Sequence, residues 1–66
     1  MNIERYVGRS AEIVYRESKG GLTVKRVSVY AVRDGKVRVL DWNRRAFGTL
    51  RANRIVAAIP VIGRVS

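Results

Sequence analysis

The feature that most constrains the fold is a tight-turn signal near the middle of the chain, Arg33-Asp34-Gly35-Lys36. An Asp-Gly pair supplies the positive backbone φ angles that a two-residue β-hairpin requires. The runs on either side, 22–32 and 37–42, are rich in valine and other strand-forming residues. We therefore expect two antiparallel strands joined at Asp34-Gly35, and the rest of the fold has to be built around that hairpin.

A further strand is predicted on the N-terminal side of this hairpin. Residues 11–16 carry apolar side chains at each odd-numbered position, a period of two that is typical of a strand. Ser18-Lys19-Gly20-Gly21 has the composition of a turn and leads into the run 22–32. Within 22–32 the apolar residues change from even to odd positions. This change predicts a β-bulge near Lys25-Arg26 that would keep one face of the strand apolar.

Two short strands are predicted on the C-terminal side. They cover residues 46–50 and 55–59, and a tight connection at 51–54 joins them. The polar turn Asn43-Arg44-Arg45 precedes the first of these strands, and Pro60 ends the second.

The N-terminal segment has a different pattern. Ile3, Tyr6 and Val7 are spaced as neighbours on one face of a helix, and Asn2 is a residue type that caps helix starts. We expect one or two helical turns ahead of Gly8.

The expected fold is all-β. Five short strands within residues 11–60 cannot make a flat sheet with both faces covered, whereas a strongly bent sheet curled into a small barrel hides its own edges. We expect a short helical segment at 1–10, the small β-barrel at 11–60 and a frayed tail at 61–66. A chain of 66 residues is one domain with a thin core. The predicted core consists of Ile13, Tyr15, Leu22, Val24, Val27, Val29, Val37, Val39, Leu50, Ile55, Ala57 and Ile59.

The charge of the chain points to a class of partner. Fourteen Lys and Arg residues, eleven of them arginine, face five Asp and Glu residues, which gives a net charge of +9. An excess this large in a small protein favours a polyanion partner, although it is also compatible with arginines spread over a solvated surface.

The absence of His and Cys leaves no obvious general acid, nucleophile or metal site, so we expect neither an enzyme nor a cofactor. No run is long and apolar enough to cross a bilayer, so we expect a soluble, cytoplasmic protein without a membrane partner.

A basic segment between positions 42 and 54 contains the first group of candidate binding residues. Guanidinium groups neutralise phosphates, and aromatic faces stack on bases. The alternative interpretation is that the two aromatic residues belong to the core or rim of the barrel and that the arginines are merely exposed. The group consists of Trp42, Arg44, Arg45, Phe47, Arg51 and Arg54.

Several segments resemble the WYL domain family. Residues 13–21, Ile-Val-Tyr-Arg-Glu-Ser-Lys-Gly-Gly, are similar to the family's opening strand and polar turn. Residues 26–30, Arg-Val-Ser-Val-Tyr, resemble its Arg-Val-x-Pro-Tyr motif, and Asp-Gly-Lys with an apolar strand follows at 34–42. Residues 47–55, Phe-Gly-Thr-Leu-Arg-Ala-Asn-Arg-Ile, resemble its closing Phe-Arg-Thr-Phe-Arg-Leu-Asp-Arg-Ile. The Trp-Tyr-Leu triplet itself is replaced by Val37-Arg38-Val39.

The resemblance implies an SH3-like or Sm-like barrel and a role in bacterial regulation. It also implies a second group of site residues, Tyr15, Arg26, Tyr30 and Arg51, near one another on the concave side or rim of the barrel. Tyr15 could equally be a core residue, and Arg26 a charge that protects an edge strand from aggregation. Family members usually carry a helix-turn-helix domain, for which 66 residues leave no room, so a solitary sensor or a partner subunit is expected.

The expected function is therefore a non-enzymatic binding or sensor module. Its ligand would be single-stranded DNA or RNA or a nucleotide-like anion. The alternative is an interaction module that forms a homodimer or binds an acidic or regulatory protein. Salt dependence separates the two, because counterion release makes nucleic-acid binding weaken steeply with salt. Arg51 and Arg26 are expected to belong to the site, and Arg33 and Arg64 to lie far from it.

Overall fold

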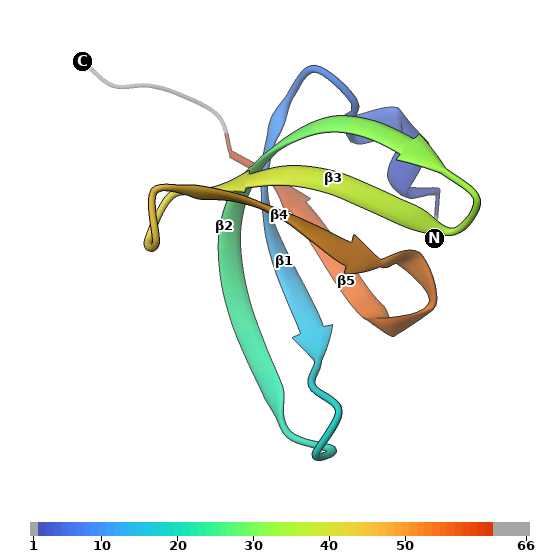
Figure 1. The fold of residues 1–66 in the computed structure, drawn as a ribbon, viewed down its shortest axis with the longest axis vertical. Coiled ribbons are helices and arrows are strands. Elements are labelled where there is room, and N and C mark those ends of the chain that lie inside the picture. Colours follow the sequence, from blue (N-terminus) through green and yellow to red (C-terminus); the bar gives the residue numbers. More distant parts are fainter. Residues whose placement is uncertain (1, 62–66) are drawn as a thin grey trace.

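A single antiparallel sheet of five strands organises the computed structural model, which describes residues 2–61 (Figure 1). The strand order is β4-β3-β2-β1-β5, so the first and last strands of the chain are neighbours. No helix in the described part of the chain is long and apolar enough to cross a membrane. The elements are η1 (Ile3–Tyr6), β1 (Ser10–Arg16), β2 (Leu22–Arg33), β3 (Lys36–Asp41), β4 (Ala46–Arg51), η2 (Ala52–Arg54) and β5 (Ile55–Pro60).

Both local signals in the N-terminal half of the chain are confirmed. The β2–β3 hairpin turns at Asp34 and Gly35, whose φ angles are 53° and 73°, and Arg33 pairs with Lys36 across it. Positive φ at both central positions is the geometry that Asp-Gly favours. The N-terminal helical turn is the 3-10 helix η1, and the Asn2 side chain accepts a hydrogen bond of 3.2 Å from the backbone N–H of Glu4.

The bulge in β2 lies elsewhere than predicted. The pairing of β1 with β2 runs without interruption through Lys25 and Arg26, and the shift falls instead in the β2–β3 ladder, between Val29 and Ala31. Tyr30 is the extra residue, and both it and Ala31 are exposed. The predicted bulge is unnecessary because Lys25 can occupy the inner face, where its ammonium group lies 3.5 Å from the Glu17 carboxylate.

The core occupies one face of the sheet, which we call the inner face; the opposite side is the outer face. Seven predicted core residues are buried there, and two that were not predicted, Ile3 and Ala11, join them. Ile3 comes from η1, whose Tyr6 hydroxyl donates a 3.1 Å hydrogen bond to the Ala58 carbonyl oxygen and so ties the helix to β5. The seven are Ile13, Tyr15, Val27, Val29, Val37, Val39 and Leu50.

Four predicted core residues were wrong, and the pairing register explains each. Leu22 and Val24 lie on the outer face near the tip of the projecting β1–β2 hairpin, and they are 58% and 62% exposed (Figure 1). Ile59 is also exposed, because a register shift in the β1–β5 ladder at Val56 moves it and Ala57 to the outer face. Ile55 remains on the inner face and is half-buried.

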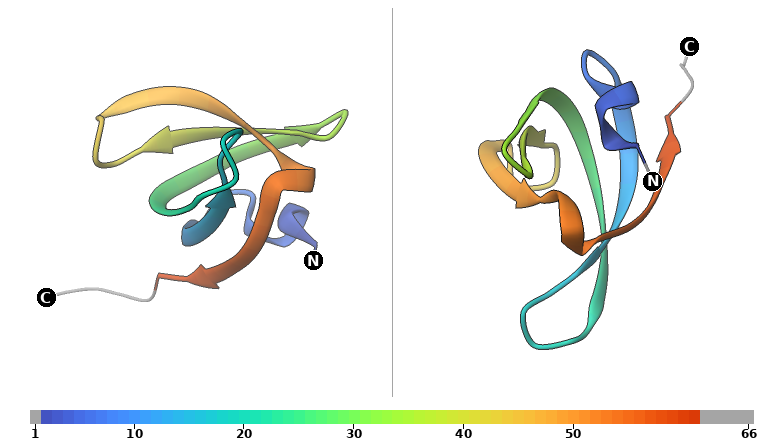
Figure 2. Two further views of the ribbon diagram at one scale, coloured as in Figure 1. Left: turned by 90° about the horizontal axis from the view of Figure 1, so that it is seen from below. Right: turned by 90° about the vertical axis from the view of Figure 1, so that its right-hand side faces the viewer.

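The sheet is strongly curled, as the two views in Figure 2 show. The backbone N–H of Arg51, at the end of β4, donates a 3.0 Å hydrogen bond to the hydroxyl oxygen of Tyr15 on β1. In the strand order β4 and β1 are three positions apart, a separation of about 14 Å in a flat sheet. Only a curled sheet brings these two atoms together. The predicted tail at 61–66 lies, apart from Val61, outside the described residues.

Candidate nucleic-acid interface

Two exposed aromatic side chains lie against each other on the outer face. The ring centroids of Tyr30 on β2 and Phe47 on β4 are 5.6 Å apart, with the ring planes tilted by 47°. Tyr30 is 52% exposed and Phe47 is 71% exposed. Phe47 pairs with Leu40 of β3 on this face, while the bulge turns Tyr30 outward. The interpretation of Phe47 as a core residue is therefore wrong, and its ring offers a large apolar surface to a ligand.

Trp42 is the other aromatic residue of the basic segment 42–54 and lies just beyond the end of β3. Its indole Nε1 donates a 2.9 Å hydrogen bond to the Ser28 hydroxyl oxygen on β2. Its backbone N–H donates to the carbonyl oxygen of Arg26 at 3.0 Å, which continues the β2–β3 pairing by one residue. These two bonds hold the indole at the border of the outer face with part of its surface exposed.

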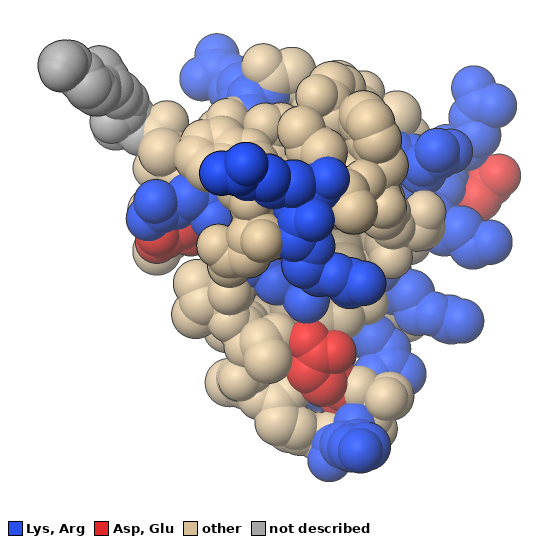
Figure 3. Space-filling view, turned by 60° about the vertical axis from the view of Figure 1, so that its left-hand side comes forward, with Lys and Arg blue, Asp and Glu red and all other residues tan. Residues whose placement is uncertain are grey.

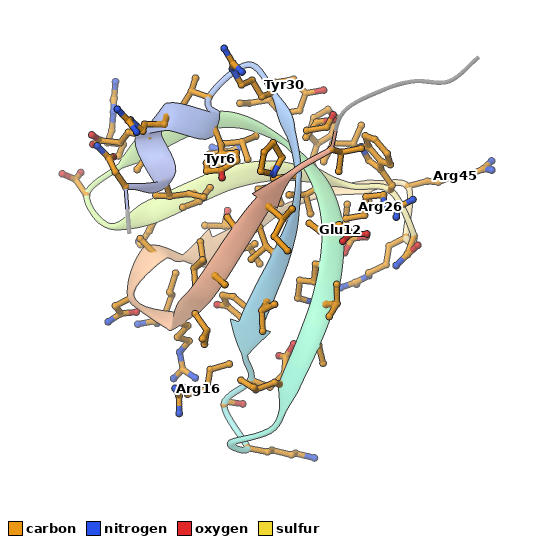
Figure 4. The ribbon with its side chains drawn as sticks, turned by 180° about the vertical axis from the view of Figure 1, so that it is seen from behind. Tyr6, Glu12, Arg16, Arg26, Tyr30 and Arg45 are labelled. Carbon is orange, nitrogen blue, oxygen red and sulfur yellow. The ribbon has the colours of Figure 1, made fainter. Side chains whose placement is uncertain are left out.

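The turn between β3 and β4 carries Arg44 and Arg45. The Asp41 carboxylate accepts hydrogen bonds from the backbone N–H groups of Asn43 and Arg44, at 3.0 and 3.3 Å, which shapes the turn. Such a local side-chain bond is the usual stabiliser of a turn that follows Asp. Both arginine side chains are exposed, and Figure 4 shows Arg45 extending away from the sheet. They are thus available to an anion that approaches the aromatic side chains.

Arg26 belongs to the outer face, and its nearest charge is a carboxylate. It lies opposite Glu12 of β1 in the ladder, and its guanidinium Nη2 is 2.6 Å from the Glu12 Oε2 (Figure 4). Tyr15, by contrast, points to the inner face and is buried. The predicted grouping of Arg26 and Tyr30 with Tyr15 is therefore wrong, because strand alternation places Tyr15 on the inner face and the other two on the outer face. Arg51 reaches the Tyr15 hydroxyl through its backbone N–H, while its side chain alternates with that of buried Leu50.

The remaining predicted residues gather at a separate depression of about 390 Å³, lined by Tyr15, Glu17, Ser18, Arg51 and Arg54. The Tyr15 hydroxyl there already accepts the Arg51 N–H, and its ring packs in the core. This depression also contains an acid, which reduces its attraction for an anion.

That acid, Glu17, is held in its charged form. Thr23 donates a 2.6 Å hydrogen bond to its carboxylate, and this bond, with the positive charges of Lys25 and Arg54, keeps the pKa of Glu17 below its ordinary value. The Lys25 ammonium also lies 5.8 Å from the centroid of the Tyr15 ring. Glu17 is thus a lasting negative charge beside Arg51 and Arg54, and the outer face is the better anion surface of the two.

Three cations that were not predicted as binding residues share the outer face with the aromatic pair: Arg33, Lys36 and Arg38. Alternation along β3 would have revealed two of them, since buried Val37 and Val39 require Lys36 and Arg38 to face outward. Arg33 follows from the hairpin, where it pairs with Lys36. Arg33, which was expected to lie far from the candidate site, thus shares the outer face with Tyr30 and Phe47, and Arg64 lies outside the described residues.

Positive charge dominates the side of the molecule seen in Figure 3, where Lys and Arg side chains cross the centre of the view and few acidic ones interrupt them. Only two ion pairs occur among the residues that the structure describes, Lys25–Glu17 and Arg26–Glu12. Most of the Lys and Arg side chains among residues 2–61 therefore have no carboxylate partner within those residues. No protein-family model, curated protein or solved structure matches the chain.

Proposed function

We propose that this protein is a non-enzymatic module that binds single-stranded nucleic acid on the outer face of β2, β3 and β4. The observation that carries the proposal is the exposed Tyr30–Phe47 pair, which lies on a face rich in cations without carboxylate partners. Large aromatic side chains exposed together on a small protein mark a binding surface more often than a stabilising feature.

The chemistry of this surface suits single strands better than duplexes. Unpaired bases can stack on the rings of Phe47, Tyr30 and Trp42, a contact open to any base because every base has an aromatic face. Arg44 and Arg45 supply guanidinium groups that can pair with phosphate oxygens in two parallel hydrogen bonds. The resulting affinity should depend little on base sequence and strongly on salt.

The curled sheet supports, as a finer proposal, a small barrel of the SH3-like or Sm-like type, whereas the proposed membership of the WYL-like proteins of bacterial regulation rests on the sequence resemblance alone. The observations in favour are the pairing of β1 with β5 and the Tyr15–Arg51 hydrogen bond, which draws the far edge of the sheet inward. A stand-alone module of this kind would act as a cytoplasmic sensor of nucleic acid or of a nucleotide-like anion.

The test is a binding titration with a fluorescent thymidine oligonucleotide of about 15 nucleotides at low salt. Phe47→Ala should weaken binding by about fivefold or more, because loss of one stacked base costs about 1–3 kcal/mol. Leu22→Ala is the matched control: it removes another largely exposed apolar side chain, near the tip of the β1–β2 hairpin, and should change affinity less than twofold. If wild-type protein binds no oligonucleotide at about 50 mM salt, the proposal fails.

A second candidate function is self-association, favoured by exposed apolar residues on the outer face of β5, β1 and β2. Val24, Val14 and Ala57 form one row across the three strands, with Ile59 beside it. A second copy of the chain could cover this row, although a net charge of +9 on each copy opposes the contact. Light scattering at rising salt separates the cases, since salt screens that repulsion and should promote a dimer while it weakens nucleic-acid binding.

A further inference from the structure

A basic depression lies at the hairpin end of the outer face. It has a volume of about 380 Å³ and three cationic side chains in its wall, from both strands of the β2–β3 hairpin. The one acid in its lining is Asp34, at the turn itself. Its lining residues are Ala31, Arg33, Asp34, Lys36, Arg38 and Thr49, and we refer to it below as the basic depression.

The depression exists because the residues flanking Arg38 are small. Ala31 on β2 and Thr49 on β4 are its two neighbours in the ladders, so neither side chain fills the space beside the guanidinium group. Ala31 faces outward because the extra residue Tyr30 reverses the alternation of β2 at that point. One bulge thus exposes the aromatic ring and opens the space next to it.

The charge in the depression is not neutralised by the protein. Within residues 2–61 the two ion pairs lie elsewhere, and neither involves Arg33, Lys36 or Arg38. Three cations against one carboxylate leave a net positive charge. The Thr49 hydroxyl adds a neutral hydrogen-bond donor. Two guanidinium forks, one ammonium and one hydroxyl are the donor set that phosphate oxygens accept.

The depression also adjoins the aromatic pair. Ala31 follows Tyr30 directly in β2, and Thr49 lies two residues from Phe47 in β4, on the same face. A base stacked on the Tyr30–Phe47 pair would therefore have a phosphate group of its own strand close to Arg38.

We propose that the basic depression binds a phosphate group of a nucleotide, the one next to the base on the Tyr30–Phe47 pair. This inference rests on the proposed function, which it deepens by naming the phosphate contact and the side chains that make it. Arg38 and Arg33 bind the phosphate oxygens, and Lys36 adds a point charge.

Inorganic phosphate is the first probe. It is titrated into labelled protein at constant ionic strength while NMR follows the backbone amides and the arginine Nε–Hε groups. Shifts should concentrate at residues 31–38 and 49. Arg38→Gln should weaken phosphate binding about tenfold, the effect of one charge-assisted hydrogen bond. Arg16→Gln is the matched control, since Arg16 is an exposed strand arginine at the opposite end of the sheet (Figure 4), and it should leave the affinity within twofold. Equal shifts at all arginines would overturn the inference.

The thymidine oligonucleotide is the second probe, and it separates the two proposals. We expect Arg38→Gln to weaken oligonucleotide binding as well, and Arg16→Gln to leave it nearly unchanged. If the oligonucleotide binds wild type and Arg38→Gln equally tightly, the phosphate site is refuted and the proposed function stands. If phosphate binds in the basic depression but no oligonucleotide binds, the proposed function fails and the phosphate site stands.

Discussion

Removal of the Tyr15 hydroxyl tests whether the curl of the sheet depends on the hydrogen bond between β1 and β4. The backbone N–H of Ala52 donates to the Gly35 carbonyl oxygen at 2.8 Å. Because N–H groups alternate in direction along a strand, the N–H of Arg51 must point away from β3. The Tyr15 hydroxyl oxygen, 3.0 Å away and half-buried, is the acceptor that it finds there. Tyr15→Phe keeps the buried ring and removes only this acceptor.

The expected loss is about 1–2 kcal/mol of unfolding free energy. A hydrogen bond contributes about 0.5–1.5 kcal/mol net, and a donor left partly shielded from water adds to the loss. For a domain of this size each kcal/mol lowers Tm by about 4–8 °C. Urea unfolding followed by circular dichroism measures the free energy, and hydrogen exchange at the Arg51 amide, which should accelerate, reports on the bond itself.

Tyr30→Phe is the matched control for this change. It removes the same atom from an exposed tyrosine on the outer face, for whose hydroxyl the described residues offer no hydrogen bond, and it should change stability by less than about 0.5 kcal/mol. If Tyr15→Phe is as stable as the control variant and hydrogen exchange at the Arg51 amide is unaltered, the sheet curls without this bond and the expected role of the Tyr15 hydroxyl is wrong.

Three further outcomes are expected. Thr23→Val should raise the pKa of Glu17 toward its ordinary value, and NMR titration of the carboxyl group would measure this change. Because folding lowers this pKa, the carboxylate stabilises the folded state at pH values above its unfolded-state pKa, and that stabilisation disappears as the pH falls through its folded-state pKa. Gly35→Ala should lower the unfolding free energy by about 1 kcal/mol, because φ is 73° there, and an unchanged urea midpoint would contradict the turn geometry. Ile13→Ala, at a fully buried position, should lower it by about 2–5 kcal/mol, whereas Leu22→Ala should stay within about 0.5 kcal/mol; equal losses would mean that the inner and outer faces are assigned wrongly.

The local elements could be predicted from the sequence where one residue pair determines the geometry. Asp34-Gly35 determines the hairpin because the turn needs positive φ at both positions, and Asn2 caps η1 through its own side chain. The turn before β4 follows from Asp41 and the polar residues after it. These interactions lie within a few residues of one another, so no knowledge of the tertiary fold was needed.

The faces of the strands could not be predicted equally well, because a bulge costs little and leaves no clear sequence signal. Two register shifts, at Tyr30 and at Val56, reverse the alternation of β2 and β5. The apolar pattern instead suggested a bulge at Lys25-Arg26. That prediction assumed that a lysine avoids the inner face, whereas Lys25 lies there next to the Glu17 carboxylate and the Tyr15 ring.

The candidate site was predicted in composition but not in arrangement. Tyr30, Phe47, Arg44 and Arg45, which were named as candidate binding residues, are all exposed. Their relation to Tyr15 depends on which face each strand position occupies, and this in turn depends on the bulges. The basic depression was missed for the same reason, since Ala31 lines it only because the bulge precedes it.

Because β2 contains an extra residue, the side chains on the outer face depend on the number of residues in this strand as well as on their types. The β1–β2 ladder on one side and the Asp34-Gly35 turn on the other both fix the strand, so it contains one residue more than a regular ladder between those points would hold. A deletion of a single residue at position 30 would restore regular alternation and remove the aromatic ring from the face, whereas a substitution could remove the ring but would leave the extra residue in the strand. A gap at this position, as well as a change of residue type, is therefore a mark by which proteins with and without this surface would differ.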